Sequence, residues 1–134
     1  MSKLRAFISF AAEDARIRDL FVGQGKHSDT PWVIADWSLR QPFTEKWKTQ
    51  TRPRIKRCHA VIQLVGAATF LADGAIWEVE CAKQEGIPAF GVWINRPPRP
   101  PIPSCFNRNN MIPWTWDGIA EMIEKVEHYW DNLD

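Results

Sequence analysis

Glu78 is the residue of this chain whose type and position best suit chemistry on a bound ligand. It lies in residues 73–85, where apolar residues recur at helical spacing: Ala75, Ile76, Val79 and Ala82. Asp73 can accept a hydrogen bond from a free backbone N–H, so we expect it to cap this helix. Residues 59–66 are apolar at nearly every position and predict a buried strand. If this strand is parallel to its neighbours, Glu78 lies at the carboxyl edge of the sheet, where open α/β sheets bind ligands.

A carboxylate at this edge could act through its charge and by accepting hydrogen bonds from a ligand. The N-terminus of the helix would favour the ionised form. The alternative is a solvated helix glutamate without a role in chemistry.

Size and composition predict one globular domain spanning residues 1–134, with 45% hydrophobic and 25% charged residues. The sequence has no apolar run of about 18 residues, so no transmembrane helix is expected. Its start lacks the pattern of a signal peptide. A net charge of +1 does not favour a nucleic-acid partner. The three cysteines are odd in number and widely spaced, which fits reduced thiols and a cytoplasmic protein without a membrane partner.

Strand and helix patterns alternate along the chain. Apolar runs predict strands at residues 5–10, 32–36, 59–66, 89–94 and, briefly, 111–112. Helices are expected from residue 13 to Gly23, from 45 to about 58 with a kink or break at Pro53, over 73–85 and over 116–133. This alternation predicts an α/β fold with a five-stranded parallel sheet and helices on both faces, in a flavodoxin-like strand order.

Several short motifs occur in an order that resembles one family. Phe7-Ile-Ser-Phe10, followed by Glu13-Asp14, resembles the opening of a TIR domain. Asp36-Trp-Ser-Leu39 with Pro42 resembles the second strand and next loop of the TIR-like group that includes bacterial Thoeris defence proteins. Trp77-Glu-Val-Glu-Cys-Ala82 resembles that group's W-E-[IV]-E-x-A helix, and Gly86-Ile-Pro88 then leads into the next strand. The resemblance covers about residues 4–130, nearly the whole chain.

The resemblance implies an activity, since TIR domains of this kind are NAD glycohydrolases or cyclases that require the glutamate of that helix. Position for position, this glutamate is Glu78 and not Glu80. Many TIR enzymes carry a tryptophan four residues earlier, where this chain has Gly74. The resemblance also implies TIR–TIR self-association, through the loop at residues 37–44 and a surface of a neighbouring copy.

The chemistry of NAD+ cleavage suits a single carboxylate. The nicotinamide ring is cationic and leaves readily, so catalysis must chiefly stabilise the oxocarbenium-like ribose. A carboxylate can do so through its charge and by bonding the ribose hydroxyls, so no metal or further cofactor is expected. Attack by water gives ADP-ribose, whereas attack by another atom of the same molecule gives a cyclic product. Such a product could signal to a downstream effector in antiphage defence.

Loops at the same edge should complete the site. Ser9, Phe10 and Ala11 could offer a hydroxyl, backbone N–H groups and an apolar wall, although Ser9 could also be a satisfied strand-end hydroxyl. Asp36 could bind ribose hydroxyls, as acidic residues do in dinucleotide sites, or could be a turn or cap residue.

An aromatic residue must stack on the substrate if Gly74 cannot. The three candidates are Trp37, Trp47 and Trp77. Packing in the core is the alternative for Trp37 and Trp47.

Two other segments have simpler interpretations. A basic run over residues 46–57 is a solvated helix face or a contact for phosphate or a partner. The proline-rich residues 96–103 are a stiff connection or, alternatively, a ligand for an SH3-like partner.

Two other functions remain open. A nucleoside deoxyribosyltransferase-like enzyme would use the same glutamate as a covalent nucleophile. A non-enzymatic TIR module would only assemble with other TIR domains.

Overall fold

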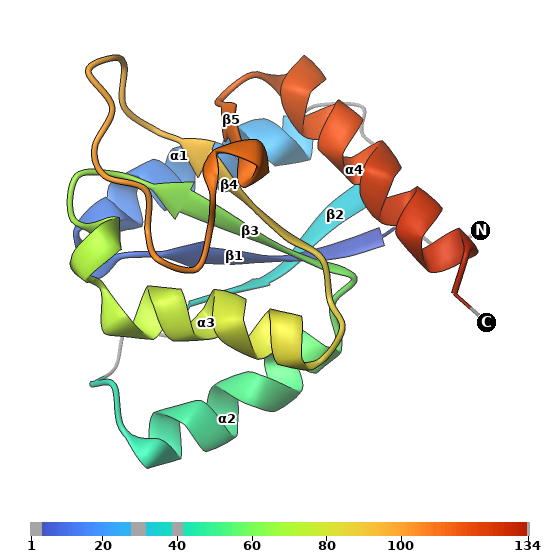
Figure 1. Cartoon of the computed structure of the whole chain (residues 1–134), viewed down its shortest axis with the longest axis horizontal. Helices are drawn as coiled ribbons and strands as arrows, with labels where there is room; N and C mark the ends of the chain where they lie inside the picture. The colour runs from blue at the N-terminus through green and yellow to red at the C-terminus, as the bar shows by residue number, and fades with distance from the viewer. Residues whose placement is uncertain (1–3, 28–31, 39–41, 134) are drawn as a thin grey trace.

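The computed structural model of the chain describes residues 4–27, 32–38 and 42–133. Its centre is a five-stranded sheet of order β2-β1-β3-β4-β5, in which all neighbouring strands are parallel (Figure 1). The strands are β1 (Leu4–Phe10), β2 (Trp32–Trp37), β3 (Ala60–Val65), β4 (Ala89–Trp93) and β5 (Met111–Pro113). The predicted α/β class, with a parallel sheet and flavodoxin-like strand order, is therefore confirmed.

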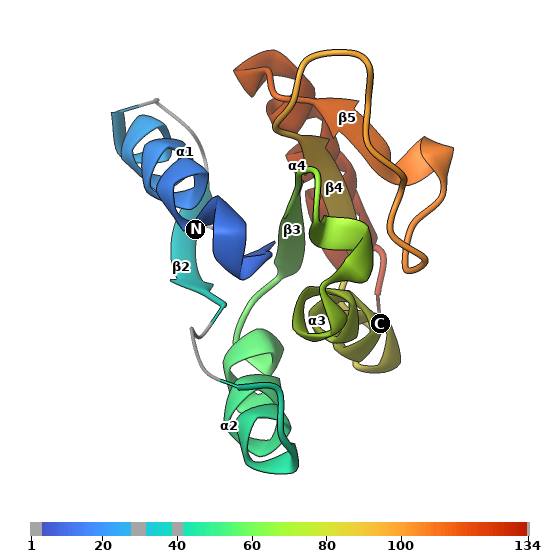
Figure 2. The ribbon, with the colours of Figure 1, turned by 90° about the vertical axis from the view of Figure 1, so that its left-hand side faces the viewer.

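Helices cover both faces of the sheet (Figures 1 and 2). They are α1 (Ala15–His27), α2 (Glu45–Lys56), α3 (Asp73–Gln84) and α4 (Trp116–Asp131). Phe21 of α1 and Ile119 of α4 pack in one buried cluster, whereas Ile55 of α2 and Val79 of α3 pack in the other. The sheet thus lies between the α1/α4 layer and the α2/α3 layer. Of the helices that the structure describes, none combines the length and apolar character that a membrane crossing requires.

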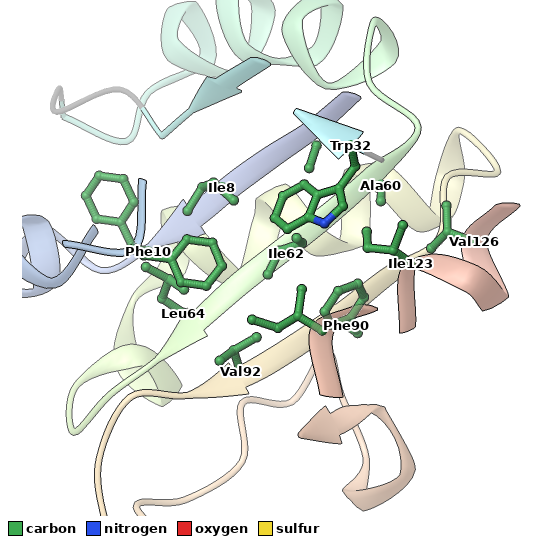
Figure 3. Close-up of a cluster of buried hydrophobic side chains, with 13 residues drawn as sticks. Ile8, Phe10, Trp32, Ala60, Ile62, Leu64, Phe90, Val92, Ile123 and Val126 are labelled. Carbon is green, nitrogen blue, oxygen red and sulfur yellow. The ribbon is translucent and has the colours of Figure 1, made fainter. Parts of the chain in front are cut away.

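Alternate residues of the central strands build the larger hydrophobic cluster, on the α1/α4 side. Figure 3 labels its members Ile8, Phe10, Trp32, Ala60, Ile62, Leu64, Phe90, Val92, Ile123 and Val126. Successive side chains of a strand point to opposite faces, so the residues between these face α2 and α3. Ser9 of β1 and Gln63 of β3 are two of them, and both are fully buried.

The strand order creates a switch point at the carboxyl ends of β1 and β3. The chain leaves β1 through α1 toward β2 on one side, then crosses back through α2 to β3 on the other side. In open parallel sheets this divergence leaves a crevice, which is the usual place for a ligand. The α3 helix, which carries Glu78, packs against β1 and β3.

A β-bulge reorients the end of β2. Ile34 pairs with Ala6, but Asp36 and not Ala35 pairs with Phe7, so β2 holds one extra residue. The bulge turns Asp36 toward the α2 side of the sheet and Trp37 toward the α1 side.

Three local predictions about the helices were wrong. The first helix does not end at Gly23 but continues to His27. The second helix has no break at Pro53, because Trp47, Thr51 and Ile55 anchor its inner face on both sides of the proline. Asp73 is the first residue of α3 and not its cap, since Ala72 holds the N-cap position. Thr44 caps α2, and its hydroxyl accepts a 3.1 Å hydrogen bond from Trp47 N.

Candidate active site

Glu78 lies in the second turn of α3 and has no exposed surface. Burial raises the pKa of its carboxyl to about 8, although hydrogen bonds from Ser38 and Ser9 act in the opposite direction. The alternative of a solvated helix glutamate is therefore wrong. Desolvation therefore opposes the ionised form that the helix N-terminus would favour.

Two serine hydroxyls hold one oxygen of this carboxyl group. Ser9 near the end of β1 donates a 2.7 Å hydrogen bond to Oε1 of Glu78, and Ser38 after β2 donates one of 2.6 Å to the same oxygen. The backbone fixes Ser38 in turn, since its N–H donates to Ile8 O at 2.9 Å. The carboxyl ends of the first two strands therefore converge on Glu78.

The second oxygen of Glu78 is different. Oε2 is buried and has no hydrogen-bond partner within residues 4–27, 32–38 and 42–133. An unsatisfied buried oxygen is costly in a folded protein and often marks a position where another group binds. Oε1 is thus anchored by the protein, while Oε2 is available to a ligand.

Gln63 extends the polar cluster into the middle of the sheet. It pairs with Ser9 across the two central strands. Its Nε2 donates to Ser9 Oγ at 3.1 Å and to Ala75 O at 2.8 Å. Gln63 therefore holds the Ser9 hydroxyl in place and ties β3 to the first turn of α3.

Phe10 is the last residue of β1 and Ala11 follows it, beside this cluster. The Phe10 ring belongs to the hydrophobic cluster on the α1/α4 side, away from Glu78. Its backbone N–H is already used, because it donates to Ser38 Oγ at 3.2 Å. Ala11 is buried, and its carbonyl accepts a hydrogen bond from Asp14 N. The Phe10 backbone N–H is therefore not free to bind a ligand in this arrangement.

Asp36 forms a two-point ion pair with Arg54 of α2. Arg54 Nε donates to Oδ2 at 2.7 Å, and Arg54 NH2 donates to Oδ1. The Trp37 backbone N–H also donates to Oδ1, at 2.9 Å. The β2 bulge makes this pair possible by turning Asp36 toward α2. Both oxygens are therefore engaged, and ribose binding by Asp36 would require the ion pair to open.

Of the three candidate tryptophans, Trp47 and Trp77 pack against each other, and Trp37 lies apart from them. Trp37 is 39% exposed on the α1 side of the sheet, where the Arg18 guanidinium lies 5.1 Å from its ring centroid. Trp47 is only 4% exposed and packs edge-on against Trp77, with ring centroids 5.3 Å apart. The packing alternative thus fits Trp47, while Trp37 presents a surface on which a ring could stack.

Trp47 also occupies the space beside Gly74. A Cβ built at Gly74 would lie 3.7 Å from Cη2 of the Trp47 indole. An aromatic ring from α2 therefore packs beside Gly74 in the first turn of α3.

The sequence did not predict Ser38, Gln63 or Asp14 as site residues. Ser38 lies inside the quoted Asp36-Trp-Ser-Leu39 motif, and Gln63 is the only polar residue of β3, so both carried a detectable signal. Asp14 follows β1 and brings its carboxylate close to the end of β3. A Cβ at Gly66 would lie 2.8 Å from Asp14 Oδ2, so glycine permits this approach. Burial raises the pKa of Asp14, and Glu13 adds to the effect.

Neither a metal site nor a match to known proteins accompanies this arrangement of described residues. Within the described residues, no three His, Cys, Asp or Glu side chains gather as a metal site would require. The chain matches no model of a known protein family and no curated protein.

Proposed function

We propose that this chain is a TIR-like enzyme that cleaves the bond between nicotinamide and ribose in NAD+, with Glu78 as the catalytic residue. The observation that carries this proposal is the asymmetry of the Glu78 carboxyl group. Ser9 and Ser38 fix Oε1, while Oε2 is buried and without a partner in the described part of the chain. The motif resemblance to TIR domains and the flavodoxin-like sheet order support the same assignment.

In this proposal Glu78 ionises when the substrate binds. Burial favours the neutral acid, with a pKa of about 8. The nicotinamide ring of NAD+ carries a positive charge, and an opposite charge nearby favours a carboxylate. The substrate would thus lower the pKa of Glu78 and release its proton. The resulting carboxylate would stabilise the oxocarbenium-like ribose and accept a hydrogen bond from a ribose hydroxyl at Oε2.

Access to Glu78 requires movement, because the side chain has no exposed surface. Ser38 is 7% exposed and covers Oε1 from the end of β2. Trp37 beside it offers the adenine or nicotinamide ring a surface for stacking. The product is either ADP-ribose or a cyclic ADP-ribose-type molecule, and the latter would act as a signal to an effector in antiphage defence, as in Thoeris systems.

Full burial of Glu78 also favours a second candidate function, that of a non-enzymatic TIR module. A neutral glutamate bonded to two serines can serve structure alone, by joining the ends of β1 and β2 to α3. A deoxyribosyltransferase-like enzyme would use Glu78 as a nucleophile, which requires the same ionisation that burial opposes in the free protein.

The test is NAD+ consumption by concentrated purified protein, with products separated against ADP-ribose and cyclic standards. Glu78→Gln should abolish turnover, whereas Glu80→Gln should retain it, because Glu80 is exposed on the same helix. Wild-type protein that is inert at every concentration tested would favour the assembly module. Mass spectrometry after incubation with a deoxynucleoside completes the test, because a stable glycosyl adduct on Glu78 would identify the transferase.

A further inference from the structure

Two helices on opposite faces of the sheet carry opposite charge. The α2 helix, in the α2/α3 layer, has five basic side chains and one acidic side chain. The α4 helix, in the α1/α4 layer, has five acidic side chains, one lysine and one histidine. The two helices lie on opposite sides of the sheet in Figure 1. The chain is thus close to neutral overall, at +1, but its charges are separated in space.

The acidic side chains of α4 form one exposed stripe. Residues at spacings of four, three, four and three share one side of this helix, and all of them are exposed: Asp117, Glu121, Glu124, His128 and Asp131. None of the four acidic members forms an ion pair with another described residue. The stripe extends over about 21 Å at a helical rise of 1.5 Å per residue. It is therefore a long acidic surface without a basic partner in the described part of its own chain.

The basic surface of α2 is hollowed. A groove of about 520 Å³ follows this helix, lined by Glu45, Lys48, Thr49, Arg52, Pro53, Lys56 and, from α3, Trp77. Its lining extends over about 16 Å of helix, which is comparable to the length of the acidic stripe. Arg52 is already bonded to Glu85 at 2.6 Å and lies over the Trp77 ring. Lys48 contacts Glu45 at 3.3 Å, and Lys56 has no ion pair with a described residue.

We propose that the α2 groove receives the α4 helix of a second copy of this chain, so that the basic side chains of the groove face the acidic stripe. Charge complementarity selects this occupant, because the groove and the stripe have opposite sign and similar length. The near-zero net charge means that copies do not repel one another as whole molecules. This contact does not depend on NAD+ cleavage.

The geometry makes the contact head-to-tail. The groove and the stripe lie on opposite faces of the sheet, so each copy that has used one surface still presents the other. Such heterologous contacts form open chains, or rings if the rotation closes. Exposed ion pairs are individually weak and are screened by salt, so the association should require high protein concentration and low ionic strength.

The experiment is sedimentation velocity at increasing protein concentration, in about 0.05 M and about 0.5 M salt. One variant loses two lysine charges of the groove (Lys48→Gln with Lys56→Gln), and a second loses the two central carboxylates of the stripe (Glu121→Gln with Glu124→Gln). A third, Lys46→Gln with Arg57→Gln, removes two exposed charges of the same region that do not line the groove. Circular dichroism confirms that each variant is folded.

We expect the average mass of the wild-type protein to rise at least twofold with concentration at low salt. At high salt the wild-type protein should stay monomeric. Each of the first two variants alone should be monomeric, and the third should behave as wild type. An equimolar mixture of the first two should form dimers and nothing larger, because only one intact groove and one intact stripe can meet. A monomeric wild type at low salt, a monomeric mixture, or association of the groove variant alone would each overturn the proposal.

Discussion

The Ser38 hydroxyl donates a 2.6 Å hydrogen bond to Oε1 of Glu78, although 40 residues of chain separate them. Ser9 adds a bond of 2.7 Å to the same oxygen across 69 residues. The carboxyl group thus joins the ends of β1 and β2 to α3. Its position depends on the packing of three elements, and its ionisation should affect both stability and activity.

The first prediction concerns stability and pH. The pKa of Glu78 is raised from 4.5 to about 8 in the folded protein, so its contribution is fully present below pH 4.5 and is lost as pH rises through about 8. At 1.36 kcal/mol per unit the loss is at most about 5 kcal/mol. Glu78→Gln cannot ionise and should remove this dependence, which makes it more stable than wild type at pH 9. Urea unfolding between pH 5 and pH 9 measures the free energy of unfolding of wild type, Glu78→Gln and the control Glu80→Gln. If the free energy of Glu78→Gln fell with pH as steeply as that of Glu80→Gln, the prediction would be wrong.

A second prediction concerns Ser38. Ser38→Ala removes a donor to Glu78 Oε1 and an acceptor for Phe10 N. We expect unfolding free energy to fall by about 1–3 kcal/mol, because buried polar groups lose their partners. The pKa of Glu78 should rise further, since the Ser38 hydrogen bond lowers it. Titration of the Glu78 carboxyl by NMR tests the shift, with Ser104→Ala, an exposed serine, as the control. An unchanged pKa would show that Ser38 does not hold the carboxyl group.

If Glu78 acts as a carboxylate, the pH dependence of NAD+ cleavage should report its ionisation. The value of kcat/KM reflects the free enzyme, in which the pKa is about 8, so it should rise with pH up to that value and then level off. At saturating substrate the midpoint should lie lower, because the cationic ring favours the carboxylate. Initial rates between pH 6 and pH 9.5 test both statements. A kcat/KM that is flat or falls over this range would argue against an ionised Glu78.

Much of the fold was predictable, because apolar runs and helical stripes mark the elements directly. β3 is apolar except for Gln63, and α4 has a clear stripe that ends up buried at Ile119, Ile123 and Val126. Gly23 did not predict the end of α1, because it does not adopt the positive φ by which a glycine ends a helix; among the described glycines that conformation occurs at Gly86.

The candidate site was only partly predictable. Helical position and motif identified Glu78, but its neutral state depends on full burial, which no local pattern reveals. The contact from Ser38 depends on where β2 ends, and the partner of Asp36 depends on a bulge that one extra residue creates. These are tertiary relationships between distant segments, so spacing along the chain could not supply them.

A fourth prediction separates the roles of two tryptophans. Trp47 is 4% exposed and packs against Trp77 and Gly74, so Trp47→Ala should lower the unfolding free energy by about 3–5 kcal/mol. Trp37 is 39% exposed, so Trp37→Ala should cost less stability, about 1 kcal/mol, while raising KM for NAD+. Urea unfolding and initial-rate kinetics measure the two effects. An unchanged KM in folded Trp37→Ala would exclude this ring from substrate stacking.

The position of Glu78 beneath two serines from distant segments also bears on how the protein matures. Ser9, Ser38 and Glu78 are supplied by successive parts of the chain, and their hydrogen bonds form only when β1, β2, β3 and α3 have all docked. No fragment, truncated product or nascent chain that lacks one of these segments can assemble the complete arrangement. Any activity that relies on it is therefore withheld until synthesis has passed α3.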